Sequence, residues 1–183
     1  MKKIVSIVGG GVIGAGWASR FLLMGWNVNI FDRDPDVKRK VDEILANARR
    51  SLPGLYEVEL PPEGELTFYN SLELAVKGAI WIQESIPERL ELKHDVYKEI
   101  LKFSDKDAII CSSTSGFKPS ELNNGLNPSN RIMVAHPFNP VYLLPLVELV
   151  PAASVTKKIK NKAKEILLEI GMFPLLINKE IEA

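Results

Sequence analysis

Short apolar runs alternate along this chain with longer segments in which apolar residues recur at helical spacing. The apolar runs predict strands at residues 3–8, 27–31, 66–69, 79–84, 108–111, 131–135, 146–150 and 173–177. The helical spacing predicts helices that begin near residues 12, 35, 71, 87 and 155, with a single helical turn around residue 121. Residues 52–64 contain three prolines and are expected to form a loop without regular structure. This alternation predicts an α/β fold with a doubly wound, mostly parallel sheet, helices on both faces, and antiparallel strands at one edge.

A glycine-rich turn follows the first predicted strand and leads directly into the first helix. It fits the Gly-x-Gly-x-x-Gly pattern of Rossmann-type dinucleotide-binding domains. Gly9 is expected to make the tight turn, Gly11 to admit a pyrophosphate, and Gly14 to let the helix pack closely on the sheet. The first N–H groups of the helix then face the phosphates. The residues of this turn predicted to bind the cofactor are Gly9, Gly11, Val12, Ile13 and Gly14.

The second predicted strand ends in Asp32, which lies 18 residues after Gly14. A carboxylate at this position accepts hydrogen bonds from the hydroxyls of the adenosine ribose. Because it would repel a 2′-phosphate, Asp32 favours NAD over NADP, although the neighbouring Arg33 keeps NADP open. The alternative interpretation is a solvated carboxylate that starts the turn before Pro35.

Composition narrows the classes of function. The 183 residues suffice for one ordinary domain, or for one domain and the beginning of another. The chain has 23 basic and 23 acidic residues, so neither a nucleic acid nor an anionic membrane is indicated as a partner. The single cysteine, Cys111, excludes an internal disulfide, and neither a membrane span nor a signal peptide is visible. We therefore expect a cytoplasmic protein that acts on a small molecule and holds no metal.

The candidate chemistry centres on His136, which stands where the strand at 131–135 ends. Twelve residues later, Glu148 interrupts an apolar run, and a carboxylate in such a strand is costly unless it is paired. An imidazole can take the hydroxyl proton of an alcohol while the hydride leaves carbon, and a carboxylate on its other nitrogen fixes the tautomer. The alternative is a histidine hydrogen-bonded to backbone, with Glu148 exposed on an edge strand.

Taken together, these motifs resemble the 3-hydroxyacyl-CoA dehydrogenases and their short-substrate relatives. Beyond the glycine turn and Asp32, the resemblance is carried by Gln83–Arg89, Ser112–Gly116, His136–Pro140 and Val147–Val150. It implies oxidation of a 3-hydroxyl by NAD, with His136 as the base and Glu148 as its partner.

The same resemblance assigns further residues to the site. Ser115 is expected to hydrogen-bond the substrate oxygen, Asn139 to support substrate and cofactor, and Glu84 and Arg89 to lie near the nicotinamide ribose. Ser113 is likewise expected to bind the cofactor. From the residues alone, Ser115 reads as a turn-capping residue and Glu84 as a strand-end carboxylate.

Within the family, the sequence around these motifs is most similar to members that oxidise L-carnitine to 3-dehydrocarnitine. The trimethylammonium group of carnitine suits aromatic faces, and Phe117, Phe138 and Tyr142 flank the predicted site, with ordinary packing as the alternative. The other substrates left open are a 3-hydroxyacyl-CoA such as 3-hydroxybutyryl-CoA, and L-gulonate; a non-catalytic NAD-binding module is the alternative from another class. Residues 1–183 are interpreted as the NAD-binding dehydrogenase domain, and the family's second, helical domain, expected to make a homodimer, is absent from this chain.

Overall fold

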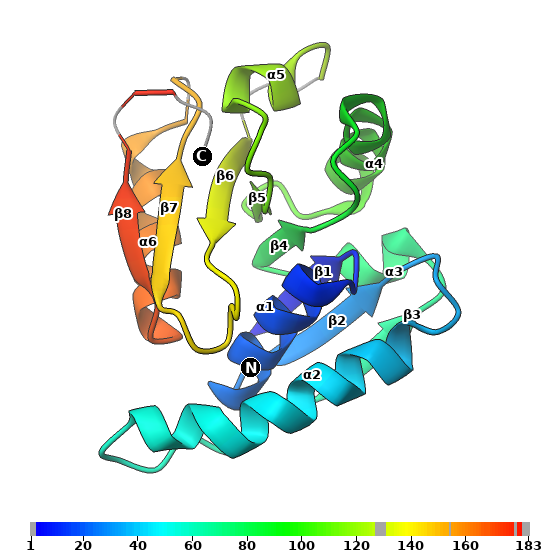
Figure 1. The fold of residues 1–183 in the computed structure, drawn as a ribbon. Helices are drawn as coiled ribbons and strands as arrows, with labels where there is room; N and C mark the ends of the chain where they lie inside the picture. Colours follow the sequence, from blue (N-terminus) through cyan, green and yellow to red (C-terminus); the bar gives the residue numbers. More distant parts are fainter. Residues whose placement is uncertain (1–2, 127–130, 154, 178, 181–183) are drawn as a thin grey trace.

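The computed structural model describes residues 3–126, 131–153, 155–177 and 179–180, which form an eight-stranded sheet with helices around it (Figure 1). The strands are β1 Ile4–Val8, β2 Asn27–Phe31, β3 Leu66–Tyr69, β4 Trp81–Glu84, β5 Ile109–Ser112, β6 Ile132–Pro137, β7 Leu146–Val150 and β8 Phe173–Leu176. The helices are α1 Val12–Leu23, α2 Val37–Ser51, α3 Leu72–Val76, α4 Leu90–Phe103, α5 Pro119–Asn123 and α6 Lys157–Glu169. None of the helices in the described ranges is long and apolar enough to cross a membrane.

The strand order across the sheet is β3-β2-β1-β4-β5-β6-β7-β8. Neighbouring strands from β3 to β6 are parallel, β7 is antiparallel to β6, and β8 is parallel to β7. The predicted doubly wound sheet with an antiparallel edge is therefore confirmed.

Alternate residues of the central strands enter two apolar cores on opposite faces of the sheet. On one face, residues such as Ile7 and Trp81 pack with α1, α2 and α6. On the other face, residues such as Ile82 and Ile110 pack with α3, α4 and α5. Because both faces are covered, the parallel strands read in the sequence as continuous apolar runs and not as an alternating pattern.

One local prediction was wrong. Residues 52–64 are not entirely irregular, because a short 3-10 helix, η1, spans Leu52–Leu55. Pro53 lies in its first turn, where a missing N–H breaks no hydrogen bond, and Leu52 is fully buried. The prolines that indicated a loop are thus compatible with one helical turn.

The carboxyl ends of the parallel strands lie at one edge of the sheet, and this edge carries the candidate site. The strand order reverses between β1 and β4, which are hydrogen-bonded neighbours. The turns that leave these two strands approach each other closely, since a Cβ placed at Gly9 would lie 2.7 Å from the carbonyl of Ser85. In open α/β sheets, ligands bind at such a switch point.

Candidate cofactor cleft and active site

A pocket of about 510 Å³ opens at this switch point. Polar and glycine residues from three turns line it together with an apolar wall. The polar and turn residues are Gly9, Gly10, Gly11, Asp32, Arg33, Asp34, Lys40, Ser85 and Pro87, and the apolar ones are Val8, Phe31, Val37, Ile86, Leu92 and Val96. An apolar cleft with a few placed polar groups is the common form of a cofactor site.

The three glycines of the predicted fingerprint have different roles in the turn. Gly9 adopts a φ of +99°, and a Cβ at Gly14 would lie 1.8 Å from the carbonyl oxygen of Gly9. Gly14 therefore lets α1 pack against the turn itself, and against the sheet only through Ile7, at 3.2 Å. A Cβ at Gly11 would meet no atom of the described residues within 4 Å, so the backbone here is open to a close ligand.

The N-terminus of α1 lies beside this opening. Its first residue, Val12, is 61% exposed, Ile13 is half-buried, and the first turn contains no acidic side chain. The free N–H groups and the positive end of the helix dipole suit a pyrophosphate. The residues present thus fit a dinucleotide.

Asp32 connects the end of β2 to the glycine turn. Its Oδ2 accepts a hydrogen bond from the N–H of Gly10 at 2.6 Å, and its Oδ1 accepts one from the N–H of Asp34 at 2.8 Å. The carboxylate thus starts the turn, as the alternative interpretation held, and also lines the pocket. Arg33 lines the same pocket, and so does Lys40, whose Nζ lies 2.5 Å from Oδ2 of Asp34. The hydrogen bond from Lys40 is the main cause that lowers the pKa of Asp34.

His136 and Glu148 face each other across the antiparallel pair β6–β7. They are directly opposite in the register, and Nδ1 of His136 lies 2.8 Å from Oε2 of Glu148. Their side chains are 20% and 24% exposed. The structure therefore brings together the two residues that the sequence paired, and the contact through Nδ1 leaves Nε2 available for another partner.

The expected substrate residues are only partly assembled around this pair. The ring of Phe138 lies 5.4 Å from the ring of His136, and Ser115 and Asn139 are exposed. Phe117 packs against the core that faces α4, whereas Tyr142 packs against the core on the opposite face of the sheet. Phe117 and Tyr142 thus pack against cores on opposite faces of the sheet, and a cage formed with Phe138 stays a prediction.

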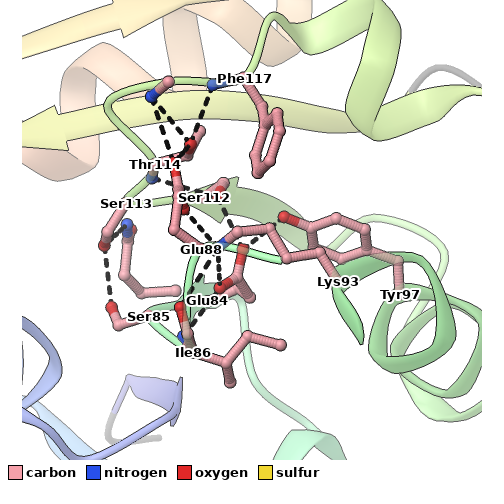
Figure 2. A network of polar contacts seen from close by, with 12 residues as sticks. Glu84, Ser85, Ile86, Glu88, Lys93, Tyr97, Ser112, Ser113, Thr114 and Phe117 are labelled. Carbon is pink, nitrogen blue, oxygen red and sulfur yellow. Dashed lines mark hydrogen bonds and ion pairs between the residues drawn. The ribbon is translucent and has the colours of Figure 1, made fainter. Parts of the chain in front are cut away.

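The side chain of Glu84, predicted to lie near the nicotinamide ribose, is completely buried. Figure 2 shows it surrounded by donors: Oε1 accepts from Nζ of Lys93 at 2.7 Å and from the N–H of Ile86 at 2.8 Å. Oε2 accepts from the hydroxyls of Tyr97 at 2.5 Å and Ser112 at 2.6 Å. This carboxylate points into the protein, and its role toward the cofactor stays a prediction. Arg89, predicted beside it, is exposed at the N-cap of α4.

Lys93 is the functional candidate that sequence reasoning missed. It is 1% exposed although it is charged. Its spacing from Val96, Tyr97 and Ile100 is that of one buried helix face, so the signal was present in the sequence.

A polar network that includes Ser113 and Gln83 links three strands at the edge of the cofactor pocket. Oγ of Ser113 accepts from Nε2 of Gln83 at 2.8 Å and lies 2.8 Å from Oγ of Ser85, which lines the pocket. The amide of Gln83 also donates to the carbonyl of Ala135, at 3.3 Å, next to His136. The ends of β4, β5 and β6 are thus held in one polar network.

A sequence model described as "3-hydroxyacyl-CoA dehydrogenase, NAD binding domain" matches residues 4–181. The chain belongs to this family. NAD is accordingly the cofactor of the domain, in agreement with the prediction from the glycine turn and Asp32.

Similar proteins have names that specify a substrate within this family. The chain is 58% identical over 178 residues to an L-carnitine dehydrogenase/betainyl-CoA thioesterase of Ruegeria pomeroyi, covering 97% of this chain and 37% of the relative. It is 50% identical over 182 residues to an L-carnitine dehydrogenase of Oceanobacillus iheyensis, covering 100% of this chain and 59% of the relative. The chain thus spans between about a third and three fifths of these proteins.

Solved structures of other dehydrogenases share the fold of this chain. A 5-formyl-3-hydroxy-2-methylpyridine 4-carboxylic acid 5-dehydrogenase, described as an NAD⁺-dependent dismutase, superposes with a TM-score of 0.89 at 26% identity, covering 100% of this chain and 59% of that one. The 3-hydroxybutyryl-CoA dehydrogenase of Escherichia coli superposes with a TM-score of 0.83 at 21% identity, covering 96% and 38%. The second likeness shows the fold alone.

Proposed function

We propose that the protein carrying this domain oxidises the 3-hydroxyl of L-carnitine to 3-dehydrocarnitine with NAD as the hydride acceptor. The observation that carries the proposal is the hydrogen-bonded pair His136–Glu148 at the sheet edge that also holds the cofactor cleft. The choice of carnitine is supported by relatives at 50–58% identity that are described as L-carnitine dehydrogenases.

In this proposal His136 is the general base. With Nδ1 bonded to Glu148, Nε2 is the nitrogen that takes the proton of the substrate hydroxyl. The carboxylate of Glu148 holds the ring in that tautomer and stabilises the imidazolium that forms. Bound NAD supplies the acceptor for the hydride that leaves the carbon atom bearing this hydroxyl. Ser115, exposed beyond β5, donates to the substrate oxygen.

Phe138 is the aromatic residue best placed for the trimethylammonium group. Its side chain is 37% exposed and its ring lies beside His136, so a substrate held over the ring has its hydroxyl near the base. A quaternary ammonium over an aromatic face gains about 0.5–2 kcal/mol from the ring quadrupole. A 3-hydroxyacyl-CoA would make no use of this feature.

The test is a substrate screen with the full natural chain. L-carnitine, 3-hydroxybutyrate, 3-hydroxybutyryl-CoA and L-gulonate are each supplied with NAD, and NADH formation is followed by absorbance. We expect the highest kcat/KM with L-carnitine, and in the variant His136→Gln a kcat lower by about 10²–10⁴-fold with NAD affinity unchanged. A preference for the acyl-CoA substrate or for L-gulonate would refute carnitine, and wild-type turnover by His136→Gln would refute the base.

We also propose that residues 1–183 are the NAD-binding dehydrogenase domain of a cytoplasmic homodimer. The family resemblance supports the dimer, and the single buried thiol, Cys111, suits a reducing compartment. Light scattering on the full chain after size exclusion measures the subunit number, and a monomer would refute the dimer.

A further inference from the structure

A buried lysine lies between two carboxylates beside the candidate site. Nζ of Lys93 is 2.7 Å from Oε1 of Glu84 and 3.2 Å from Oε2 of Glu88. The side chains of Lys93 and Glu84 are 1% and 0% exposed, whereas that of Glu88 is 43% exposed. Charges so deeply buried persist only when their hydrogen bonds are satisfied, so the arrangement of this cluster is strongly constrained.

Glu84 is the last residue of β4, and Glu88 lies in the turn between β4 and α4. Both carboxylates contact the end of β5 or the segment that follows it. Glu84 accepts from the hydroxyl of Ser112 at 2.6 Å. Oε1 of Glu88 accepts from the hydroxyl of Thr114 and from the N–H of Gly116, the latter at 3.2 Å. Figure 2 shows the two carboxylates side by side beneath this segment, with Lys93 between them.

Thr114 is the point where this cluster meets the backbone of the segment. Its side chain is nearly completely buried, at 2% residue exposure. Its Oγ1 donates to Glu88 and accepts from the N–H groups of Gly116 at 3.2 Å and Phe117 at 3.1 Å. One hydroxyl therefore holds the backbone on both sides of Ser115, which is itself exposed.

The electrostatics favour a carboxylate that stays ionised in this position. Partial burial raises the pKa of Glu88, but the hydrogen bond from Thr114 and the charge of Lys93 outweigh it, and the net pKa lies below the ordinary value. Glu88 thus remains an acceptor for Thr114 at neutral pH.

We propose that Thr114 is a positioning residue whose hydroxyl, anchored on Glu88, holds Ser115 at the sheet edge for the substrate. This role rests on the proposed function, in which Ser115 contacts the substrate oxygen. Because Thr114 is only 2% exposed, it acts through Ser115 and not by contact with the substrate. A reacting group displaced by about 1 Å loses on the order of 10²-fold in rate, so a loosened segment lowers kcat more than it weakens binding.

The test compares Thr114→Val with Thr114→Ser in the full natural chain. Valine keeps the shape of threonine and lacks the hydroxyl, whereas serine keeps the hydroxyl. We expect Thr114→Val to lower kcat with L-carnitine by about tenfold or more, to leave the Kd for NAD within about threefold, and to accelerate amide exchange of residues 112–118, measured by mass spectrometry. Thr114→Ser retains both kcat and protection.

The matched control is Thr67→Val, a half-buried threonine of β3, the edge strand separated from β5 by β2, β1 and β4. It is expected to change neither kcat nor exchange of residues 112–118. Should Thr114→Val fail to fold, Thr114→Ala removes the same hydroxyl and needs no extra space.

The outcomes separate this proposal from the proposed function. Unchanged exchange and kcat in Thr114→Val, or equal losses in Thr114→Val and Thr114→Ser, would overturn the positioning role. If the wild-type protein oxidises none of the four hydroxy compounds, the proposed function fails. Exchange of residues 112–118 then still decides whether Thr114 holds the segment.

Discussion

Asp32 supports the glycine turn and is expected to select the cofactor, and the substitution Asp32→Asn perturbs both. Both of its carboxylate oxygens accept backbone N–H groups, from Gly10 in the phosphate turn and from Asp34 in the following turn. In Asp32→Asn one of these oxygens becomes an amide nitrogen, so one backbone N–H faces another donor. The substitution also removes the negative charge that we expect beside the ribose 2′-position.

The substitution affects the two cofactors differently, because only NADP carries the 2′-phosphate. A hydrogen bond from a ribose hydroxyl to the charged carboxylate would contribute about 1.5–3 kcal/mol, and its loss corresponds to roughly 10–150-fold in affinity for NAD. Removal of one charge near a 2′-phosphate relieves about 1–4 kcal/mol of repulsion at a separation of about 4 Å, depending on the local dielectric constant. NAD affinity should therefore fall by about tenfold or more, while NADP affinity changes much less.

Calorimetric titration of NAD and NADP into both proteins measures this directly. The wild-type domain is expected to bind NAD at least about tenfold more tightly than NADP, and Asp32→Asn to narrow that ratio. The control is Asp36→Asn, which changes an exposed carboxylate paired with Arg39 outside the pocket and should leave both affinities unchanged. Equal wild-type affinities for NAD and NADP, or an unchanged ratio in Asp32→Asn, would remove Asp32 from the ribose site.

Three further changes test the surroundings of the site. Glu148→Gln should lower kcat by about 10²-fold with KM for carnitine nearly constant, because an amide cannot stabilise the imidazolium of His136; steady-state kinetics that show a raised KM and an unchanged kcat would contradict this. Asp34→Asn should raise NADP affinity by severalfold or more because it frees Lys40, and the added change Lys40→Met should cancel the gain in calorimetry. Because the pKa of Glu88 is lowered in the folded protein, its ionised carboxylate stabilises the fold. This contribution should be complete above the ordinary carboxyl pKa of about 4.3 and should be lost as pH falls through the lower folded-state pKa. The Tm difference between wild type and Glu88→Gln should accordingly shrink from pH about 7 to about 3, and a constant difference would contradict it.

The sequence predicted the parts of the structure that depend on local pattern. The parallel strands are buried on both faces and therefore stand out as apolar runs, and the glycine turn has a fixed relation to the strand and helix on either side. His136 and Glu148 could also be paired in advance, because a carboxylate inside an apolar strand needs a partner. The short, proline-rich connection made the antiparallel return the simplest way to supply one.

The features that the sequence did not predict depend on the direction of side chains. The pattern of apolar and polar residues does not specify this direction at the ends of strands. Glu84 is the last residue of β4, where the alternation of faces stops being informative. Its carboxylate is directed into the protein by donors distant in sequence, among them Lys93 and Tyr97 on the inner face of α4. Tyr142 follows the active-site motif in sequence, but the loop that carries it turns its ring to the opposite core.

Helix α1 connects the cofactor cleft with the His136–Glu148 pair. Its N-terminus lies beside the pocket lined by Gly11, and a Cβ at Gly16, one turn further along, would lie 2.8 Å from Cβ of Val141 in the loop between β6 and β7. Arg20, on the next turn of the same helix, is buried and donates to the carbonyl of Tyr142 in that loop at 3.1 Å. The loop sets the register in which β7 returns, and that register places Glu148 opposite His136. Glycine at position 16 therefore lets α1 lie close to the loop that leads from His136 to Glu148.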